Sequence, residues 1–274
     1  MTDKILNVEN MPIHSVWDDC NIALMLSHDT GLAIAEFFSN RKFENIVAVY
    51  FEEESEYSEK VCGLLGVDAE RVFYGKEISS SSEHIDWIKE QDVDFVITVY
   101  WPWLLGSEYL AAIKDSVNFH PALLPVNRGW YPHVHSLIDE SPAGVTLHRI
   151  SEGADEGDVW IQKEINIACN ETAKDIYLRL QSEILNLFVE TWEKISLGQI
   201  GPVKQDESSA IYHSKNELNS LDKIEFDGLN ARQLFNLLRA RSFGQKGFAY
   251  FEVDGKKHYL NLRISESHNF SNES

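Results

Sequence analysis

Short, continuous runs of apolar residues alternate with amphipathic segments through the first two hundred residues, and this alternation restricts the possible folds more than any other feature. Asn21–Ser27, Ile46–Phe51 and Val93–Tyr100 are three such runs, and each has the length and β-branched content of a buried strand. Between them, Thr30–Asn40 and Glu54–Leu65 have the apolar spacing of helices. Buried strands separated by helices are typical of a parallel sheet covered on both faces. We therefore predict an α/β fold with a mainly parallel, twisted sheet.

The same alternation continues to about residue 197, after which the composition changes. The further elements expected are strands over Arg71–Tyr74, Ser116–His120, Gly144–Ile150 and Val159–Ile167, and helices over Ser82–Gln91, Pro132–Asp139 and Thr172–Leu197. Beyond Gly201-Pro202 we expect a helix, Ala231–Arg241, and a hairpin of Gly247–Val253 and Lys257–Ile264 around the turn pair Asp254-Gly255. We predict two domains, residues 1–200, with residues 1–19 as an N-terminal extension, and a small C-terminal α+β subdomain, residues 201–274.

The charge balance and the cysteine content exclude several classes of protein. Lysine and arginine total 24 against 44 acidic residues, a net charge of −20, which repels phosphate backbones and anionic membranes. The three cysteines, Cys20, Cys62 and Cys169, are too few and too scattered for a disulfide framework or a thiolate zinc site. We find neither a signal peptide nor an apolar run of membrane-spanning length. We expect a cytoplasmic protein that binds neither nucleic acid nor membrane.

Two polar side chains lie at the end of one predicted strand. Asn118 and His120 are two residues apart on Ser116–His120, so they point to the same face, near the carboxyl edge where open α/β sheets bind ligands. An amide and an imidazole together can stabilise a developing oxyanion, and the imidazole can also move a proton. Taken alone, such a short motif is more often a strand-end pair that backbone groups satisfy, because motifs of this length arise freely.

A carboxylate follows in the turn Gly153–Asp158. Asp155 could orient His120, support its charged form or relay a proton through water. The alternative is an ordinary turn residue, because aspartate and glycine are common in turns.

Considered together, these segments resemble the formyltransferase family that depends on 10-formyltetrahydrofolate. The resemblance rests on Asn118–Pro125, Arg128-Gly129, Gly144–His148 and Asp155–Gly157. It extends from about Asn21 to Leu197, with its diagnostic core in Asn118–Asp158. It implies a Rossmann-like formyltransferase core for residues 1–200 and transfer of a formyl group to an amine, without a metal.

The resemblance also assigns roles to individual residues. The catalytic residues fall on Asn118, His120 and Asp155; Asp155 is chosen over Asp158 because the family's carboxylate directly precedes a residue-glycine pair. The folate would lie against the loops Tyr100–Leu105 and Ile150–Asp155. The cofactor-binding candidates are Val99, Trp101, Leu104, Ile150, Gly153 and Asp155. His133 and His135 resemble a metal-ligand pair, but no cysteine or carboxylate at ligand spacing joins them, so we expect no metal.

The choice of acceptor depends on the rest of the chain. Asn127–His133 resembles the Asn-Arg-Gly-aromatic-aromatic-Pro signature of sugar N-formyltransferases, and Ala210–Ile264 resembles their tail. The charge of −20 and the short tail disfavour a tRNA acceptor. Glycinamide ribonucleotide enzymes lack such a tail and have a Gly-rich phosphate loop where this chain has Ser27–Gly31, which contains an acid. Formyltetrahydrofolate hydrolases place a regulatory domain ahead of the catalytic one.

We therefore predict formyl transfer from 10-formyltetrahydrofolate to a dTDP-linked, or less favourably GDP-linked, 3- or 4-amino-dideoxy hexose for bacterial surface polysaccharide (O-antigen, lipopolysaccharide). The substrate-binding candidates are Arg128, Trp130, Tyr131, His148, Lys215, Arg239 and Arg241. Each of them is also readily explained as an ordinary surface or packing residue. The alternatives are a glycinamide ribonucleotide or other small-amine formyltransferase and a non-enzymatic folate-binding scaffold. We expect a homodimer formed through the C-terminal subdomain.

Overall fold

A computed structural model describes residues 20–41 and 44–265 of the 274-residue chain. The predicted N-terminal extension, residues 1–19, lies outside the described residues. The chain divides into two compact units. The first contains the described residues up to Asn118 together with Arg149–Glu152, and the second contains Phe119–His148 and the residues from Gly153 onward.

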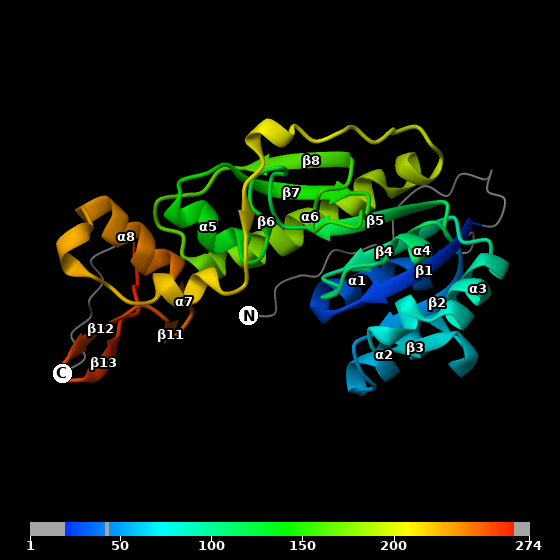
Figure 1. The fold of residues 1–274 in the computed structure, drawn as a ribbon, viewed down its shortest axis with the longest axis horizontal. Helices are drawn as coiled ribbons and strands as arrows, with labels where there is room; N and C mark the ends of the chain where they lie inside the picture. Colours follow the sequence, from blue (N-terminus) through cyan, green and yellow to red (C-terminus); the bar gives the residue numbers. More distant parts are fainter. Residues whose placement is uncertain (1–19, 42–43, 266–274) are drawn as a thin grey trace. The chain divides into compact units, whose positions relative to one another are not determined.

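The first unit is built on parallel strands separated by helices (Figure 1). Its strands are β1 (Cys20–Leu26), β2 (Glu44–Phe51), β3 (Val72–Tyr74), β4 (Phe95–Val99) and most of β5 (Asp115–His120). Its helices are α1 (His28–Ser39), α2 (Glu56–Leu65), α3 (Ser82–Glu90), α4 (Ser107–Leu110) and the 3₁₀ turns Ala69–Arg71 and Glu77–Ser80. The strand order is β3-β2-β1-β4. Leu24 of β1 pairs with Val49 on one side and with Ile97 on the other.

Burial explains why these segments became strands. Every residue of β4 is buried, as is every residue of β1 except Asn21, which is the pattern of parallel strands covered on both faces. Helix α2 begins at a capping box formed by Ser55 and Ser58 and ends at Gly66, whose φ of 63° is left-handed. The predicted parallel sheet is thereby confirmed in this unit.

The second unit begins with the last two residues of β5 and continues with β7 (Ala143–His148) and β8 (Val159–Ile165), which follow β5 in the strand order. β7 and β8 are antiparallel, with Val145 opposite Lys163. Helix α5 (Pro132–Ile138) and the 24-residue helix α6 (Ala173–Ser196) belong to this unit. The buried face of α6 includes Ile176, Leu180, Ile184, Leu187, Phe188, Trp192 and Ile195, which is the helical spacing expected from the sequence.

The C-terminal part of this unit is small and mixed. Its elements are β6 (Arg128–Gly129), which pairs with β9 (Tyr212–His213), the 3₁₀ turns Glu207–Ser209 and Phe226–Gly228, α7 (Glu217–Leu221), α8 (Ala231–Ala240), β10 (Ser242–Phe243), β11 (Lys246–Gly247), β12 (Tyr250–Val253) and β13 (Lys256–Tyr259). Strands β12 and β13 form the predicted hairpin around Asp254-Gly255, both with positive φ. The two strands are shorter than expected. Ile224, Leu237 and Ala249 form the buried centre of a small core.

The domain boundary expected near residue 200 from composition does not coincide with the boundaries of the two compact units. The two units separate within β5 and again around Arg149–Glu152, whereas the composition changes after α6. Among the described residues, no helix has both the length and the apolar content to cross a membrane.

Candidate active site

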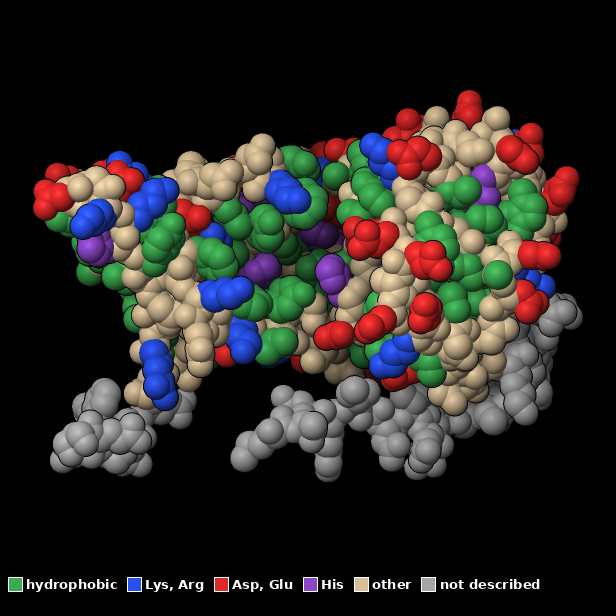
Figure 2. All heavy atoms as spheres, turned by 90° about the horizontal axis from the view of Figure 1, so that it is seen from below, with side chains coloured by type: hydrophobic (Ala, Val, Ile, Leu, Met, Phe, Trp, Pro, Cys, Tyr) green, Lys and Arg blue, Asp and Glu red, His purple; other side chains and the backbone are tan. Residues whose placement is uncertain are grey.

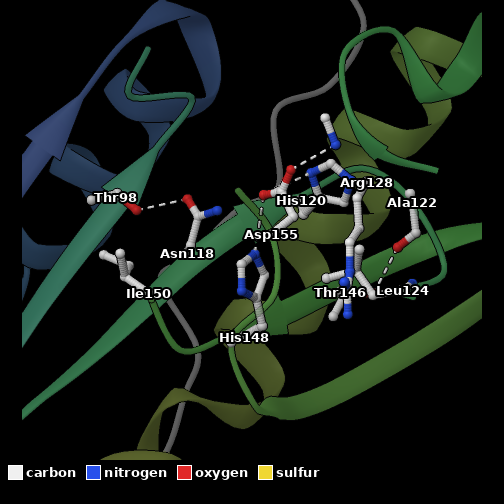
Figure 3. A network of polar contacts seen from close by, with 12 residues as sticks. Thr98, Asn118, His120, Ala122, Leu124, Arg128, Thr146, His148, Ile150 and Asp155 are labelled. Carbon is white, nitrogen blue, oxygen red and sulfur yellow. Dashed lines mark hydrogen bonds and ion pairs between the residues drawn. The ribbon is translucent and has the colours of Figure 1, made fainter. Parts of the chain in front are cut away.

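In the first unit, Asn118 lies close to the end of β5 with its amide held by a neighbouring strand. The Thr98 hydroxyl on β4 donates to Asn118 Oδ1 at 2.6 Å (Figure 3). Because this bond fixes the carbonyl end of the amide, the NH₂ group is directed away from Thr98. The side chain therefore presents a hydrogen-bond donor in a fixed orientation, as oxyanion stabilisation requires.

In the second unit, two histidines converge on one carboxylate. His120 Nδ1 lies 3.4 Å from Asp155 Oδ1, and His148 Nε2 lies 3.5 Å from the same oxygen. The two imidazole rings are nearly perpendicular, with centroids 6.2 Å apart, and both point toward Asp155 in Figure 3. His120 and His148 are 4% and 1% exposed. His120 thus lies beside Asp155, and His148 joins them.

The tautomer of His120 follows from its second contact. His120 Nε2 lies 2.9 Å from the main-chain carbonyl oxygen of Asn127. A carbonyl can only accept, so Nε2 carries a hydrogen. Nδ1, which faces Asp155, is therefore the nitrogen that gains or loses a proton.

Asp155 adopts a backbone conformation that few non-glycine residues tolerate. Its φ is 58°, in the left-handed region, where aspartate and asparagine are over-represented. The Gly129 N–H donates to Asp155 Oδ2 at 2.8 Å, while Oδ1 faces the two histidines. Each carboxylate oxygen thus has its own role, one anchored to the backbone and the other turned to the imidazoles.

The electrostatics of this pair favour an ionised acid and a neutral base. Burial alone would raise the pKa of the Asp155 carboxyl, but His120, His148 and the Gly129 N–H together hold that pKa below its usual range. Burial lowers the pKa of His120 below its usual value, although Asp155 opposes this. At neutral pH the imidazole can accept a proton, and the adjacent carboxylate stabilises the resulting cation.

Further contacts hold the Asp155 turn, and their central residue, Gln205, lies outside every motif predicted from the sequence. The Gln205 amide donates to the carbonyl oxygens of Asp155 and Gly157 and accepts from Arg128. Gln205 belongs to a polar stretch without periodicity or motif, fifty residues beyond Asp155. No local sequence signal could have identified it.

The predicted substrate-binding residues differ in their exposure and in how many of their hydrogen-bond donors already have acceptors within the chain. Trp130 is 37% exposed, and Lys215 Nζ lies 4.7 Å above its ring. Tyr131 precedes α5 with a left-handed φ of 56°. Arg128, Arg239 and Arg241 are all buried. Arg128 donates to Gln205 and Glu207, and Arg241 donates to Asp222. Arg239 donates to the Asn236 side chain and to the main-chain carbonyls of Ala168 and Cys169. At Arg128, whose three nitrogens all donate to Gln205 or Glu207, a ligand phosphate would have to displace these acceptors.

The predicted folate-binding residues range from a fully buried core residue to a largely exposed one. Val99 is fully buried and its carbonyl accepts from the Ser27 N–H, so its side chain belongs to the core. Trp101 is half-buried and Leu104 is 61% exposed. The Ile150 N–H donates to the Ser116 hydroxyl, and a Cβ at Gly153 would overlap the Glu156 carboxylate. Folate binding by these residues stays a prediction.

A group of potential metal ligands lies elsewhere in the second unit. His135, Asp139 and His213 each bring a ligand atom within 4.8 Å of the others, whereas the sequence analysis had considered His133 with His135. The rings of His135 and His213 stack at 3.5 Å with 7° between their planes. Their ring-nitrogen lone pairs therefore lie in parallel planes and do not converge on one ion.

The chain matches two protein families. Residues 20–191 match the family described as formyl transferase, and residues 217–266 match the N-formyltransferase dimerization C-terminal domain. A curated relative, the methionyl-tRNA formyltransferase of Sulfurihydrogenibium sp. (strain YO3AOP1), is 28% identical over 71% of this chain and 62% of its own length. The chain spans only about three fifths of the length of such relatives.

Solved structures resemble the chain over more of its length. A 4-N formyltransferase from Francisella tularensis is 22% identical, with a TM-score of 0.76 over 90% of this chain and 99% of that one. An N-formyltransferase from Helicobacter canadensis, solved with folinic acid and dTDP-3-aminofucose, is 19% identical, with a TM-score of 0.63 over 87% and 86%. At these identities the likeness establishes the shared fold.

Proposed function

The chain belongs to the formyl transferase family, and from this premise we propose that it transfers a formyl group from 10-formyltetrahydrofolate to the amino group of a nucleotide-linked amino-dideoxy sugar. The observation that carries the proposal is the buried pairing of a neutral His120 with an ionised Asp155, two residues along β5 from an oriented Asn118 amide. Formyl transfer needs these groups, an oxyanion donor and a proton acceptor.

The proposed reaction is a nucleophilic acyl transfer. The neutral amine of the sugar attacks the formyl carbon, a new C–N bond forms, and the carbonyl electron pair moves to the oxygen. Asn118 donates to that oxyanion, and such a donor is worth about 3–4 kcal/mol in other acyl transfers. His120 acts on the proton instead, because its Nε2–H is bound by the Asn127 carbonyl and its Nδ1 faces Asp155. The attacking nitrogen loses a proton through His120 and Asp155. The folate nitrogen then leaves with the electrons of the breaking C–N bond and takes up a proton.

Two observations support a nucleotide sugar as the acceptor. A solved sugar N-formyltransferase from Shewanella sp. FDAARGOS_354 resembles the chain with a TM-score of 0.71 over 90% of its length. The TM-score is 0.60 over 89% of the chain for the methionyl-tRNA formyltransferase of Clostridium thermocellum. Acidic side chains are also spread over the first unit on the face drawn in Figure 2, consistent with the net charge of −20. Such a surface opposes binding of tRNA.

The cavity that follows β1 and β2 argues against glycinamide ribonucleotide. This cavity of about 190 Å³ is lined by Ser27, His28, Glu52 and Glu53, among others. Although the N-terminus of α1 points a positive dipole end here, the two carboxylates disfavour a phosphate. We assign the nucleotide instead to the surface around Trp130 and Lys215, whose ring and cation suit a base or sugar and a diphosphate.

We further propose a dTDP-linked substrate, with the product used in surface polysaccharide, and a homodimer. The dTDP assignment is supported by the Helicobacter canadensis complex. The dimer is supported by the family matched over residues 217–266. It is also supported by apolar residues that this region leaves exposed, Leu229, Phe235, Phe248, Val253 and Tyr259.

The proposal is tested by a formyl-transfer assay with 10-formyltetrahydrofolate and a panel of acceptors. The panel contains dTDP-4-amino- and dTDP-3-amino-dideoxyhexoses, GDP-perosamine, glycinamide ribonucleotide and methionyl-tRNA. We expect turnover of one dTDP-sugar and none of the last two. Turnover of methionyl-tRNA or glycinamide ribonucleotide alone would overturn the acceptor assignment. Folate binding without turnover of any acceptor would favour a binding protein.

A further inference from the structure

Gln205 lies on the segment that follows α6, yet its side chain reaches the turn that carries Asp155. Its Nε2 donates to the main-chain carbonyl oxygens of Asp155 at 2.8 Å and of Gly157 at 2.7 Å. These two carbonyls flank Glu156 in the connection between β7 and β8. One amide group therefore determines the path of the backbone on both sides of residue 156.

The other end of the same amide is tied to a buried cation. Gln205 Oε1 accepts from Arg128 Nε at 3.1 Å and from Nη2 at 2.8 Å. Arg128 is 4% exposed, and its remaining donors form a bidentate pair with Glu207 at 2.7 and 3.0 Å. A buried guanidinium needs its charge and all its donors satisfied, so it fixes the segment containing Gln205 and Glu207 in place.

The two ends of this network meet again at Asp155. Gly129, the neighbour of Arg128 in β6, donates its N–H to Asp155 Oδ2. Gln205 thus binds the Asp155 backbone, and Gly129 binds the Asp155 carboxylate. Arg128 links the two, because it donates to Gln205 and is the chain neighbour of Gly129. The arrangement keeps Asp155 at its left-handed φ of 58°, a conformation that persists only where its surroundings enforce it.

We propose that Gln205 is a positioning residue for Asp155, and through it for the protonation of His120; this inference rests on the proposed function. Only a primary amide fits the place, because it must donate twice to carbonyl oxygens and accept from Arg128. Arg128 then acts within this frame rather than as a ligand for substrate phosphate. The active site accordingly includes a residue from beyond the predicted boundary at residue 200.

Two variants of similar size separate the hydrogen bonds of Gln205 from the space that its side chain fills. Gln205→Glu keeps the acceptor for Arg128 but places a carboxylate oxygen against the carbonyls of Asp155 and Gly157. Gln205→Met keeps the length and removes every hydrogen bond. We expect each to lower kcat about tenfold to a hundredfold, because displacing a catalytic group by an ångström has effects of that size. KM for both substrates should change far less, because Gln205 contacts neither of them in the proposed mechanism.

A second readout needs neither substrate nor turnover. In the wild-type protein the Gly129 amide proton is bound to a carboxylate, which moves its NMR signal downfield. We expect this signal to move upfield in Gln205→Glu and Gln205→Met, as in the reference variant Asp155→Asn. Asp206→Asn is the matched control, because Asp206 is the exposed neighbour of Gln205 and its carboxylate accepts from Ser208 within its own turn.

The outcomes distinguish this inference from the function on which it rests. If the Gln205 variants fold, as judged by thermal unfolding, and keep both wild-type kcat and the wild-type Gly129 signal, the positioning role is wrong. If the wild-type protein transfers no formyl group, the proposed function fails, while the Gly129 signal still tests whether Gln205 holds Asp155.

Discussion

Asp155 combines a charge with an unusual backbone conformation, and substitutions can separate the two. Its carboxylate faces His120 and His148, while its φ of 58° is one that alanine adopts at a cost. Asparagine tolerates the left-handed region about as well as aspartate. Asp155→Asn therefore removes the charge alone, whereas Asp155→Ala also strains the turn.

We predict that Asn118→Ala, His120→Ala and Asp155→Asn each lower kcat at least about a hundredfold, the size of effect seen for single oxyanion donors and proton carriers. All three variants should still fold, which a cooperative thermal unfolding transition would show. Asp155→Ala should lose activity to a similar degree and also unfold at a lower temperature. Steady-state kinetics and thermal unfolding check this; near-normal turnover in His120→Ala would contradict the assignment.

The sequence identified the groups proposed to perform chemistry but not those that hold them. Asn118, His120 and Asp155 lie in short motifs whose residue types have a chemical reason. Thr98 and Gln205 lie 20 and 50 residues from the groups they bind. A contact between side chains so far apart along the chain arises from tertiary packing and leaves no periodicity or spacing to detect.

Among the elements, those with a long apolar pattern were predicted well. Strands β1 and β4 and helix α6 lie within a few residues of their expected ranges, because burial on one or both faces imposes a regular pattern. Strands β6 and β9 were not predicted, since two-residue strands are too short to show any period. Their pairing depends on Gly129, where a Cβ would overlap the His213 carbonyl oxygen.

Two glycines of the C-terminal subdomain offer a matched test of element packing. A Cβ at Gly247 in β11 would overlap the Leu260 carbonyl group, whereas nothing lies near Gly255 in the hairpin turn. We predict that Gly247→Ala destabilises the subdomain by about 1–3 kcal/mol, as overpacking does. Gly255→Asn should cost less, because its side chain meets no neighbouring atom and asparagine tolerates a positive φ such as the 73° found there better than most residues do.

Limited proteolysis and light scattering measure both effects. We expect faster cleavage after α6 and a shift toward monomer in Gly247→Ala alone. A Gly247→Ala protein with the wild-type mass and cleavage rate would show that the subdomain tolerates the change and would remove this support for its role in the dimer.

At the scale of the whole molecule, buried neutral histidines connect stability to pH. His84 and His135 are 5% and 3% exposed, and burial lowers the pKa of each to about 4, with His213 contributing for His135. The unfolded chain has a histidine pKa near 6.5. Between these two values the unfolded chain binds protons that the folded protein does not, so acidification favours unfolding.

We predict that the free energy of unfolding falls as the pH is lowered from 6.5 toward 4, by up to about 1.4 kcal/mol per pH unit for each such histidine. Above pH 6.5 this contribution is fully present. Urea unfolding at several pH values measures the slope. His84→Gln, which can still accept from the Tyr50 hydroxyl, should reduce it; a stability that is flat or rising on acidification would contradict the assignment.

The hydrogen-bond network of Arg128, Gln205 and Asp155 also has a consequence for protein synthesis. Gln205 is added 77 residues after Arg128, which at ribosomal rates of about 5–20 residues per second takes roughly 4 to 15 s. Until Gln205 is added, the guanidinium lacks this partner, and the Asp155 turn, which is made 50 residues before Gln205, has no amide to hold it. The nascent chain therefore contains His120 and Asp155 seconds before Gln205 is available to hold the Asp155 turn. The site is completed only when the segment after α6 has been translated.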